Sequence, residues 1–316
     1  MSCLARKLAR VLPALLCLGW AFSAGAYETD QFHDRQLPLA DSTAILDGRV
    51  NEALEEIAAG WRGPADEGKF ARAIYWKLGG PHWVDHIERF AMRSPEVARL
   101  PRGRTIYSFP PLFTSPVLFF FGVGERLKVA EVMIGSDKLG HFFSQGYKYF
   151  RRSRRGWSED RFVTWGSRVE GWLFGQYTTR VFSNADMVAN YEGLLFYRGL
   201  FADGVLPGKG RIVAFEQGRA RILRPFSFRD HVNDYWDEAL NPSLYGASLG
   251  RHVARQLAEL CPAYLEQPKL FVTAHEEELA RRYARIGMKD ARYNRLDRFC
   301  AENRAGAAPT VTEPKP

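Results

Sequence analysis

The feature that most constrains this chain is a short polar stretch, Ser136-Asp137-Lys138-Leu139-Gly140-His141, which lies inside an apolar helical pattern. The apolar residues of this pattern recur at the spacing of one helix face, and they are Leu139, Phe142, Phe143, Tyr147 and Phe150. Charged groups beside a buried face are costly unless they are paired. The sequence therefore predicts a polar site in contact with a helical core.

Two later helical segments supply polar groups that can meet this stretch. Glu170 follows the apolar positions of a helix that is predicted to begin near residue 158. Ser183 is a suitable N-cap for the next helix, where Asp186 stands at the capping-box position. Asp186 and Asn190 are four residues apart and share one helix face, while Gly193 continues that stripe and allows another helix to approach closely. We expect the three helices to converge on one interior site.

In their order and spacing, these residues resemble the motif pattern of VanZ-like proteins over about residues 137–196. The matching motifs are Asp137-Lys138-x-x-His141-Phe142, then Glu170 and Gln176, then Arg180-x-x-Ser183-x-x-Asp186-x-x-x-Asn190-x-x-Gly193. VanZ-like proteins span the membrane several times, whereas the helices here carry charged runs such as residues 151–155 that do not suit a span. The resemblance implies a role in the cell envelope and a related helical core without its membrane spans.

Four residues are candidates both for catalysis and for metal binding: Asp137, His141, Glu170 and Asp186. Histidine together with carboxylates is a suitable ligand set for zinc, manganese or iron, and a divalent metal activates water at neutral pH. In the absence of a metal, a histidine polarised by an aspartate can serve as a general base. The residues assigned to ligand binding are Lys138, Arg180 and Asn190.

The predicted function is that of a metal-dependent or acid/base hydrolase that acts on an envelope lipid or glycan. The alternative is a non-catalytic envelope binding or structural protein, in which the same residues form a packing network, because buried polar groups must be satisfied. The sequence contains no P-loop or CxxC motif, which argues against nucleotide hydrolysis and redox chemistry. His82 and His86 form a second candidate metal pair, although surface histidines explain them more simply.

The first 26 residues have the pattern of a secretory signal peptide. A basic start precedes an apolar run from Val11 to about Ala21, and Ala24-Gly25-Ala26 offers the small residues of a cleavage site. The prediction is export to the periplasm or cell envelope. Of the formal net charge of +8, three positive charges lie in this leader, which leaves a mildly basic chain. Export makes nucleic acid an improbable partner and envelope lipids or glycans the expected ones.

Two cysteines remain after the signal peptide, Cys261 and Cys300. In an oxidising compartment such a pair is more often bonded than free, so a disulfide between them is predicted.

The predicted fold class is mainly α, with one helical domain over residues 27–300 and a small β-hairpin insertion. We expect the core helices over about 136–200, the hairpin over about 211–224 with Gly218 in its turn, and a disordered tail over 301–316. Residues 27–48 are expected to form an irregular surface arm, and Asn51 to cap the first helix. The apolar segment 105–123 contains three prolines, so it is expected to be a buried core piece or a peripheral membrane contact rather than a span.

Overall fold

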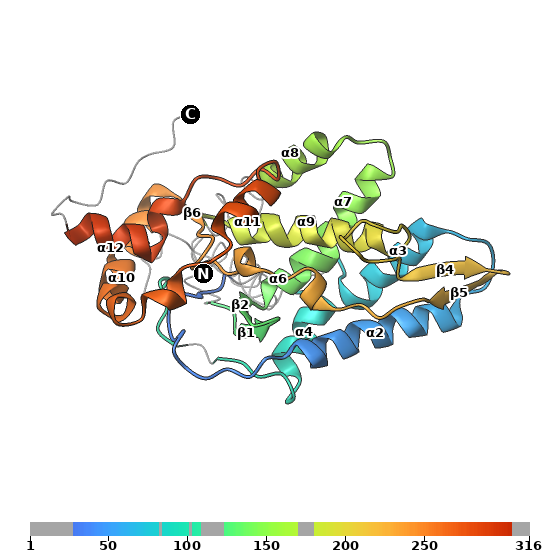
Figure 1. Ribbon diagram of the computed structural model, residues 1–316, viewed down its shortest axis with the longest axis horizontal. Coiled ribbons are helices and arrows are strands. Elements are labelled where there is room, and N and C mark those ends of the chain that lie inside the picture. Colours follow the sequence, from blue (N-terminus) through green and yellow to red (C-terminus); the bar gives the residue numbers. More distant parts are fainter. Residues whose placement is uncertain (1–27, 82–83, 101–102, 109–122, 170–179, 305–316) are drawn as a thin grey trace, which may run out of the picture.

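The computed structural model describes residues 28–81, 84–100, 103–108, 123–169 and 180–304 (Figure 1). Several sequence predictions therefore lie outside the described residues. They concern the signal peptide, most of the segment 105–123, His82, Glu170, Gln176 and nearly all of the C-terminal tail.

The described chain is mainly α-helical, which confirms the predicted fold class. Its helices are α2 (Thr43–Gly60), α3 (Glu67–Leu78), α4 (His86–Arg93), α6 (Asp137–Gly140), α7 (Gly146–Ser153), α8 (Glu159–Val169), α9 (Asn184–Gly199), α10 (Ala247–Glu266), α11 (Glu276–Arg282) and α12 (Leu296–Arg304). The strands form three small antiparallel pairs: β1 (Arg126–Val129) with β2 (Val132–Gly135), β3 (Val181–Phe182) with β6 (Leu244–Tyr245), and β4 (Val213–Glu216) with β5 (Arg219–Ile222). The last pair is the predicted hairpin, and it turns through Gln217 and Gly218, both at positive φ.

Helix α9 forms the centre of the molecule, with α6, α7 and the smaller elements around it (Figure 1). Ser183 begins it as predicted, because its hydroxyl accepts a hydrogen bond from the backbone N–H of Asp186. Nearly every residue of α9 is buried, including charged ones such as Glu192. Only Tyr191, Leu195 and Arg198, on one face of the helix, are partly exposed, so most polar residues of α9 lie in the interior.

Two glycines set the distance between α9 and the helix that carries His141. A Cβ added to Gly146 would lie 2.6 Å from the Cα of Gly193, and one added to Gly193 would overlap the carbonyl oxygen of Phe142. The two backbones are therefore in direct contact, which confirms the close approach predicted for Gly193. Between α6 and α7 the chain makes a π-helical turn, His141–Gln145. Such turns insert an extra residue into a helix and occur frequently at functional sites.

Two predictions about the N-terminal part of the chain were wrong. Thr29, Asp30, Gln31 and Phe32 are buried rather than lying on the surface, because Phe32 packs in an apolar cluster with the C-terminal helices. The first helix begins at Thr43, and Asn51 lies inside it, where its amide bonds the backbone of Phe226. The polar composition of residues 27–48 suggested a solvated arm. Thr29 and Asp30 are buried instead, because they form hydrogen bonds with distant parts of the chain.

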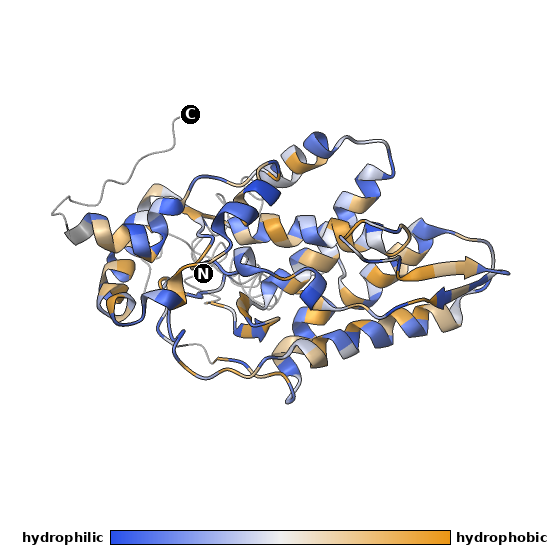
Figure 2. Ribbon diagram, in the orientation of Figure 1, coloured by the Kyte–Doolittle hydropathy of each residue, from blue (hydrophilic) through white to orange (hydrophobic). Residues whose placement is uncertain are grey.

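The apolar interior divides into two clusters. The larger one contains the inner faces of α2, α3, α7 and α9 with the aromatic residues 226–236. Figure 2 shows apolar and polar residues alternating along α2, as expected for a helix with one buried face. The smaller cluster joins α10 and α12 to β3 and β6. Among the described residues, no helix combines the length and apolar character that a membrane span requires.

The predicted disulfide joins Cys261 of α10 to Cys300 of α12, with Cα atoms 5.6 Å apart. The two helices that it links carry the smaller apolar cluster.

Replacing Gly193 with alanine should destabilise the fold by about 1–3 kcal/mol, because the new methyl group meets backbone that cannot move away. Gly48→Ala is a matched control within a helix, since nothing lies within 4 Å of a Cβ at that position. It should stabilise by about 0.5–1 kcal/mol through helix propensity. Urea unfolding of the two variants measures both changes. Equal effects of the two substitutions would contradict the close contact.

Removing the disulfide through Cys261→Ser with Cys300→Ser should lower the free energy of unfolding by about 3–4 kcal/mol, because the bond closes a loop with a sequence separation of 39 residues. The same loss should follow when reductant is added to the wild type, and reductant should not affect the double variant. Mass spectrometry that finds both thiols free in the purified protein would contradict the bond.

Candidate functional site

Lys138 lies at the centre of a buried polar cluster. Its side chain is 0% exposed, and its Nζ lies 2.6 Å from Asp137 Oδ2, 2.6 Å from Asp186 Oδ1 and 2.7 Å from Glu238 Oε1. Burial by itself lowers the pKa of this ammonium, but the three carboxylates outweigh burial and raise it well above its ordinary range. Lys138 is therefore a fixed internal cation.

The carboxylates around Lys138 differ in their proton affinity. Burial raises the pKa of Asp137 and raises that of Glu238 to about 7, in each case against the charge of Lys138. Burial also acts on Asp186, but the charges of His141 and Lys138 outweigh it and lower its pKa. Asp186 is thus the most firmly ionised carboxylate of the three.

Glu238 is held differently at its two oxygens. Its Oε1 accepts hydrogen bonds from Lys138 and from the hydroxyl of Ser183, which lies 2.8 Å away. Its Oε2 is buried and has no hydrogen-bond partner among the described residues. An unpaired buried oxygen is costly as an anion, which agrees with the raised pKa.

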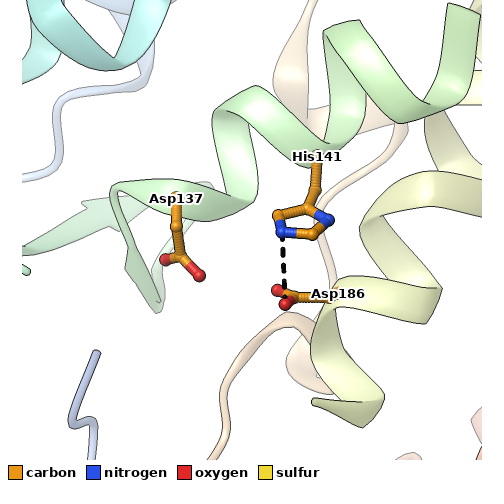
Figure 3. Close-up of side chains that lie close together, drawn as sticks. All are labelled: Asp137, His141 and Asp186. Atoms are coloured by element: carbon orange, nitrogen blue, oxygen red, sulfur yellow. Dashed lines mark ion pairs between the residues drawn. The ribbon is translucent and has the colours of Figure 1, made fainter. Parts of the chain in front are cut away.

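His141 lies one helical turn beyond Asp137 and points toward α9 (Figure 3). Its Nε2 is 3.2 Å from Asp186 Oδ2, and its Nδ1 is 3.0 Å from Asn190 Oδ1. Both ring nitrogens thus face acceptor atoms. Because the side-chain oxygen of Asn190 only accepts hydrogen bonds, Nδ1 donates to it, and Nε2 is the ring nitrogen that faces the carboxylate of Asp186. The His141 side chain is 17% exposed, so this end of the cluster reaches solvent.

Asp137, His141 and Asp186 form a group that can hold a metal ion. One ligand atom from each residue lies within 4.8 Å of the others. Figure 3 shows the aspartates on either side of the imidazole, one at the start of α6 and one on α9. Zinc binds nitrogen and oxygen ligands at about 2.0–2.2 Å from the metal, so these three atoms would move closer together around a bound ion.

Two further carboxyl groups lie beside the cluster, at the start of α4. A Cβ added to Gly140 would overlap the carboxyl group of Glu88 and lie 2.9 Å from Asp85 Oδ2. Burial, followed by the charges of Asp85 and Asp137, raises the pKa of Glu88 well above its ordinary range. Burial raises the pKa of Asp85 to about 7, although a hydrogen bond from Ser144 opposes it. Gly140 is therefore needed where the two carboxyl groups meet α6.

The structure brings together three of the four predicted catalytic and metal-binding residues, namely Asp137, His141 and Asp186. Glu170 lies outside the described residues. Asn190, predicted to bind a ligand, bonds His141 instead of standing free. Lys138 contacts three carboxylates, and Arg180 is exposed beside Gly246. The ligand-binding roles of these two cations stay predictions.

Sequence analysis missed Glu238, Asp85 and Glu88. Glu238 lies 100 positions from Lys138, in a segment with no helical periodicity. Asp85 and Glu88 stand at the beginning of a short helix, where acidic residues are expected for dipole reasons alone. Only the fold places these carboxyl groups next to α6. His86, part of the second histidine pair, is exposed on α4, and His82 lies outside the described residues.

No family model matches this chain, and neither a curated protein nor a solved structure does. The resemblance to VanZ-like proteins accordingly stays a prediction.

Asp85→Asn should weaken the pH dependence of stability. The folded protein keeps the Asp85 proton to about pH 7, whereas the ordinary pKa is 3.8, so the wild-type free energy of unfolding falls as pH rises through this range. The fall is about 1.4 kcal/mol for each unit of pKa difference. The variant should lose this contribution, retain that of Glu88, and gain stability over the wild type toward pH 7.

Urea unfolding at a series of pH values measures this effect, and Asp160→Asn on the exposed side of α8 is the control. An unchanged pH profile in Asp85→Asn would show that the buried carboxyl group does not carry the shift.

Proposed function

We propose that this chain is a hydrolase of the cell envelope that uses a divalent metal ion held by Asp137, His141 and Asp186. The observation that carries this proposal is the convergence of these three ligand atoms within 4.8 Å at the solvent-facing end of a buried cluster. The metal would activate a water molecule for attack on the substrate at neutral pH.

The position of Lys138 is compatible with a metal at this site. Lys138 contacts Oδ2 of Asp137 and Oδ1 of Asp186. The other two oxygens face elsewhere: Asp137 Oδ1 is 3.3 Å from the hydroxyl of Thr29, and Asp186 Oδ2 is directed to His141. Asp186 can therefore bind Lys138 through one oxygen and a metal through the other, whereas Asp137 would exchange its contact with Thr29 for one with the metal.

The surrounding side chains would hold the three ligands in the orientation and ionisation state that a metal requires. Asn190 accepts a hydrogen bond from Nδ1 of His141, which leaves the Nε2 lone pair free to bind a metal. Lys138 holds the two aspartates in place and offsets part of their charge. The lowered pKa of Asp186 keeps this ligand in the ionised form that a metal requires.

The proposed substrate is an envelope lipid or glycan. This assignment follows from the signal-peptide pattern and from the motif resemblance to VanZ-like proteins, both of which are properties of the sequence. The burial of the site limits the access of a substrate, because only His141 among the three ligands has more than slight exposure. A substrate would approach from the imidazole side.

A second candidate function is a non-catalytic envelope protein in which the same residues form a packing network. The observation in its favour is the complete burial of Lys138 among three carboxylates, because removing one member of such a group typically costs about 3–5 kcal/mol. In this case the polar residues would specify how α6, α9 and residues 234–241 pack, and no metal would bind.

Metal analysis of the purified chain separates the two functions. The wild type should carry one metal ion per chain, Asp137→Asn and His141→Gln should lose it while remaining folded, and Asn190→Ala should weaken binding by about 10- to 100-fold. Hydrolysis of envelope phospholipids and glycans should disappear with a chelator and return with the metal.

His86→Gln serves as the control, because it removes an exposed histidine and should leave metal content unchanged. A wild type that binds neither zinc, manganese nor iron, together with unfolding of Asp137→Asn and His141→Gln, would refute the metal site and establish the packing network.

A further inference from the structure

A cavity whose lining shares no residue with the proposed metal site lies between the beginning of α3 and the end of α7. Its volume is about 430 Å³. Most of its lining residues are cationic or aromatic; the full set is Asp66, Gly68, Lys69, Arg72, Tyr147, Phe150, Arg151, Arg154 and Arg155. The cavity is open on one side, so a ligand can enter from the surface.

The charge of this cavity is strongly positive. Five cationic side chains are opposed by Asp66 and by Glu67, which pairs with Arg154, so an excess of three positive charges remains. Within the described part of the chain, no ion pair joins Arg72, Arg151 or Arg155 to a carboxylate. Cations gathered without partners favour an anionic ligand.

The arginines converge on an aromatic floor. Tyr147 and Phe150 are largely buried, and the ring of Tyr147 stacks on Tyr75 at 4.8 Å. Burial raises the pKa of the Tyr147 phenol, and the charges of Arg151, Arg72 and Arg155 oppose this rise. The three guanidinium groups and Tyr147 line the same cavity. Guanidinium groups bind phosphate through paired N–H donors.

An exposed tryptophan lies next to this basic surface. Trp76 is 54% exposed, and its ring contacts Tyr75. It shares one face of α3 with Lys69 and Arg72, because the three positions follow helical spacing. Tryptophan beside basic residues is typical of segments that lie in the interface between water and lipid headgroups.

We infer that this cavity binds the phosphate of anionic lipid headgroups, and that the surface formed by α3 and the end of α7 rests on a membrane. The cavity supplies the site for the phosphate, and Trp76 supplies the apolar contact with the interface. None of the residues named for this surface belongs to the segment 105–123. The inference does not depend on the proposed metal site.

The experiment is sedimentation of the purified chain with phosphatidylcholine vesicles, with or without phosphatidylglycerol. We expect binding only to the anionic vesicles and weaker binding as salt increases. The triple variant Arg72→Gln, Arg151→Gln, Arg155→Gln should bind about 100-fold more weakly, because each basic residue near an anionic surface contributes about 1 kcal/mol. Trp76→Ala should also weaken binding. Because this variant lacks the Trp76 indole, it should also show a smaller change in tryptophan fluorescence when vesicles are added.

The matched control removes the same charge from exposed positions elsewhere, with Arg219→Gln, Arg251→Gln and Arg255→Gln. Equal losses in the two triple variants would overturn the inference, because net charge alone would then explain binding. Failure of the wild type to bind anionic vesicles would also overturn it. Calorimetric binding of inorganic phosphate or glycerol phosphate without vesicle binding would identify a soluble ligand and refute the membrane role.

Discussion

The ammonium group of Lys138 is the interaction on which the centre of this protein depends. Asp137, Asp186 and Glu238 come from three separate parts of the chain, and their carboxylates lie within 2.7 Å of one nitrogen. Without that cation, three buried carboxyl groups would face one another in a medium of low dielectric constant, where like charges repel strongly. The lysine thus fixes how α6, α9 and residues 234–241 meet, and it does so where His141 reaches solvent.

Backbone contact makes this arrangement possible. Gly146 and Gly193 allow the helix of His141 to touch α9, so the short side chains of Asp186 and Asn190 can reach both nitrogens of the imidazole. Longer side chains at the two glycines would separate the helices and break this contact. The close contact of the two backbones therefore determines the geometry of the polar contacts around His141.

A second buried network, around Glu192 of α9, differs from the Lys138 cluster in how its carboxylate oxygens are paired. Both oxygens of Glu192 on α9 are occupied: Oε2 is 3.1 Å from His231 Nδ1, while Oε1 accepts bonds from Arg282 and the hydroxyl of Tyr283. The side chain is 0% exposed. The Lys138 cluster differs from it, since Glu238 keeps one oxygen without a hydrogen-bond partner among the described residues.

The sequence by itself predicted the helical class, the hairpin around Gly218 and the N-cap Ser183. It also identified Asp137, His141, Asp186 and Asn190 as residues of one polar site. These features depend on local spacing and turn chemistry, which a linear pattern contains. Only the tertiary structure decided that residues 29–32 are buried, that Glu238, Asp85 and Glu88 join the centre, and that the arginines of α7 meet α3 in a cavity. Such contacts join residues far apart in the chain, and their energies arise from burial and charge pairing that no local pattern records.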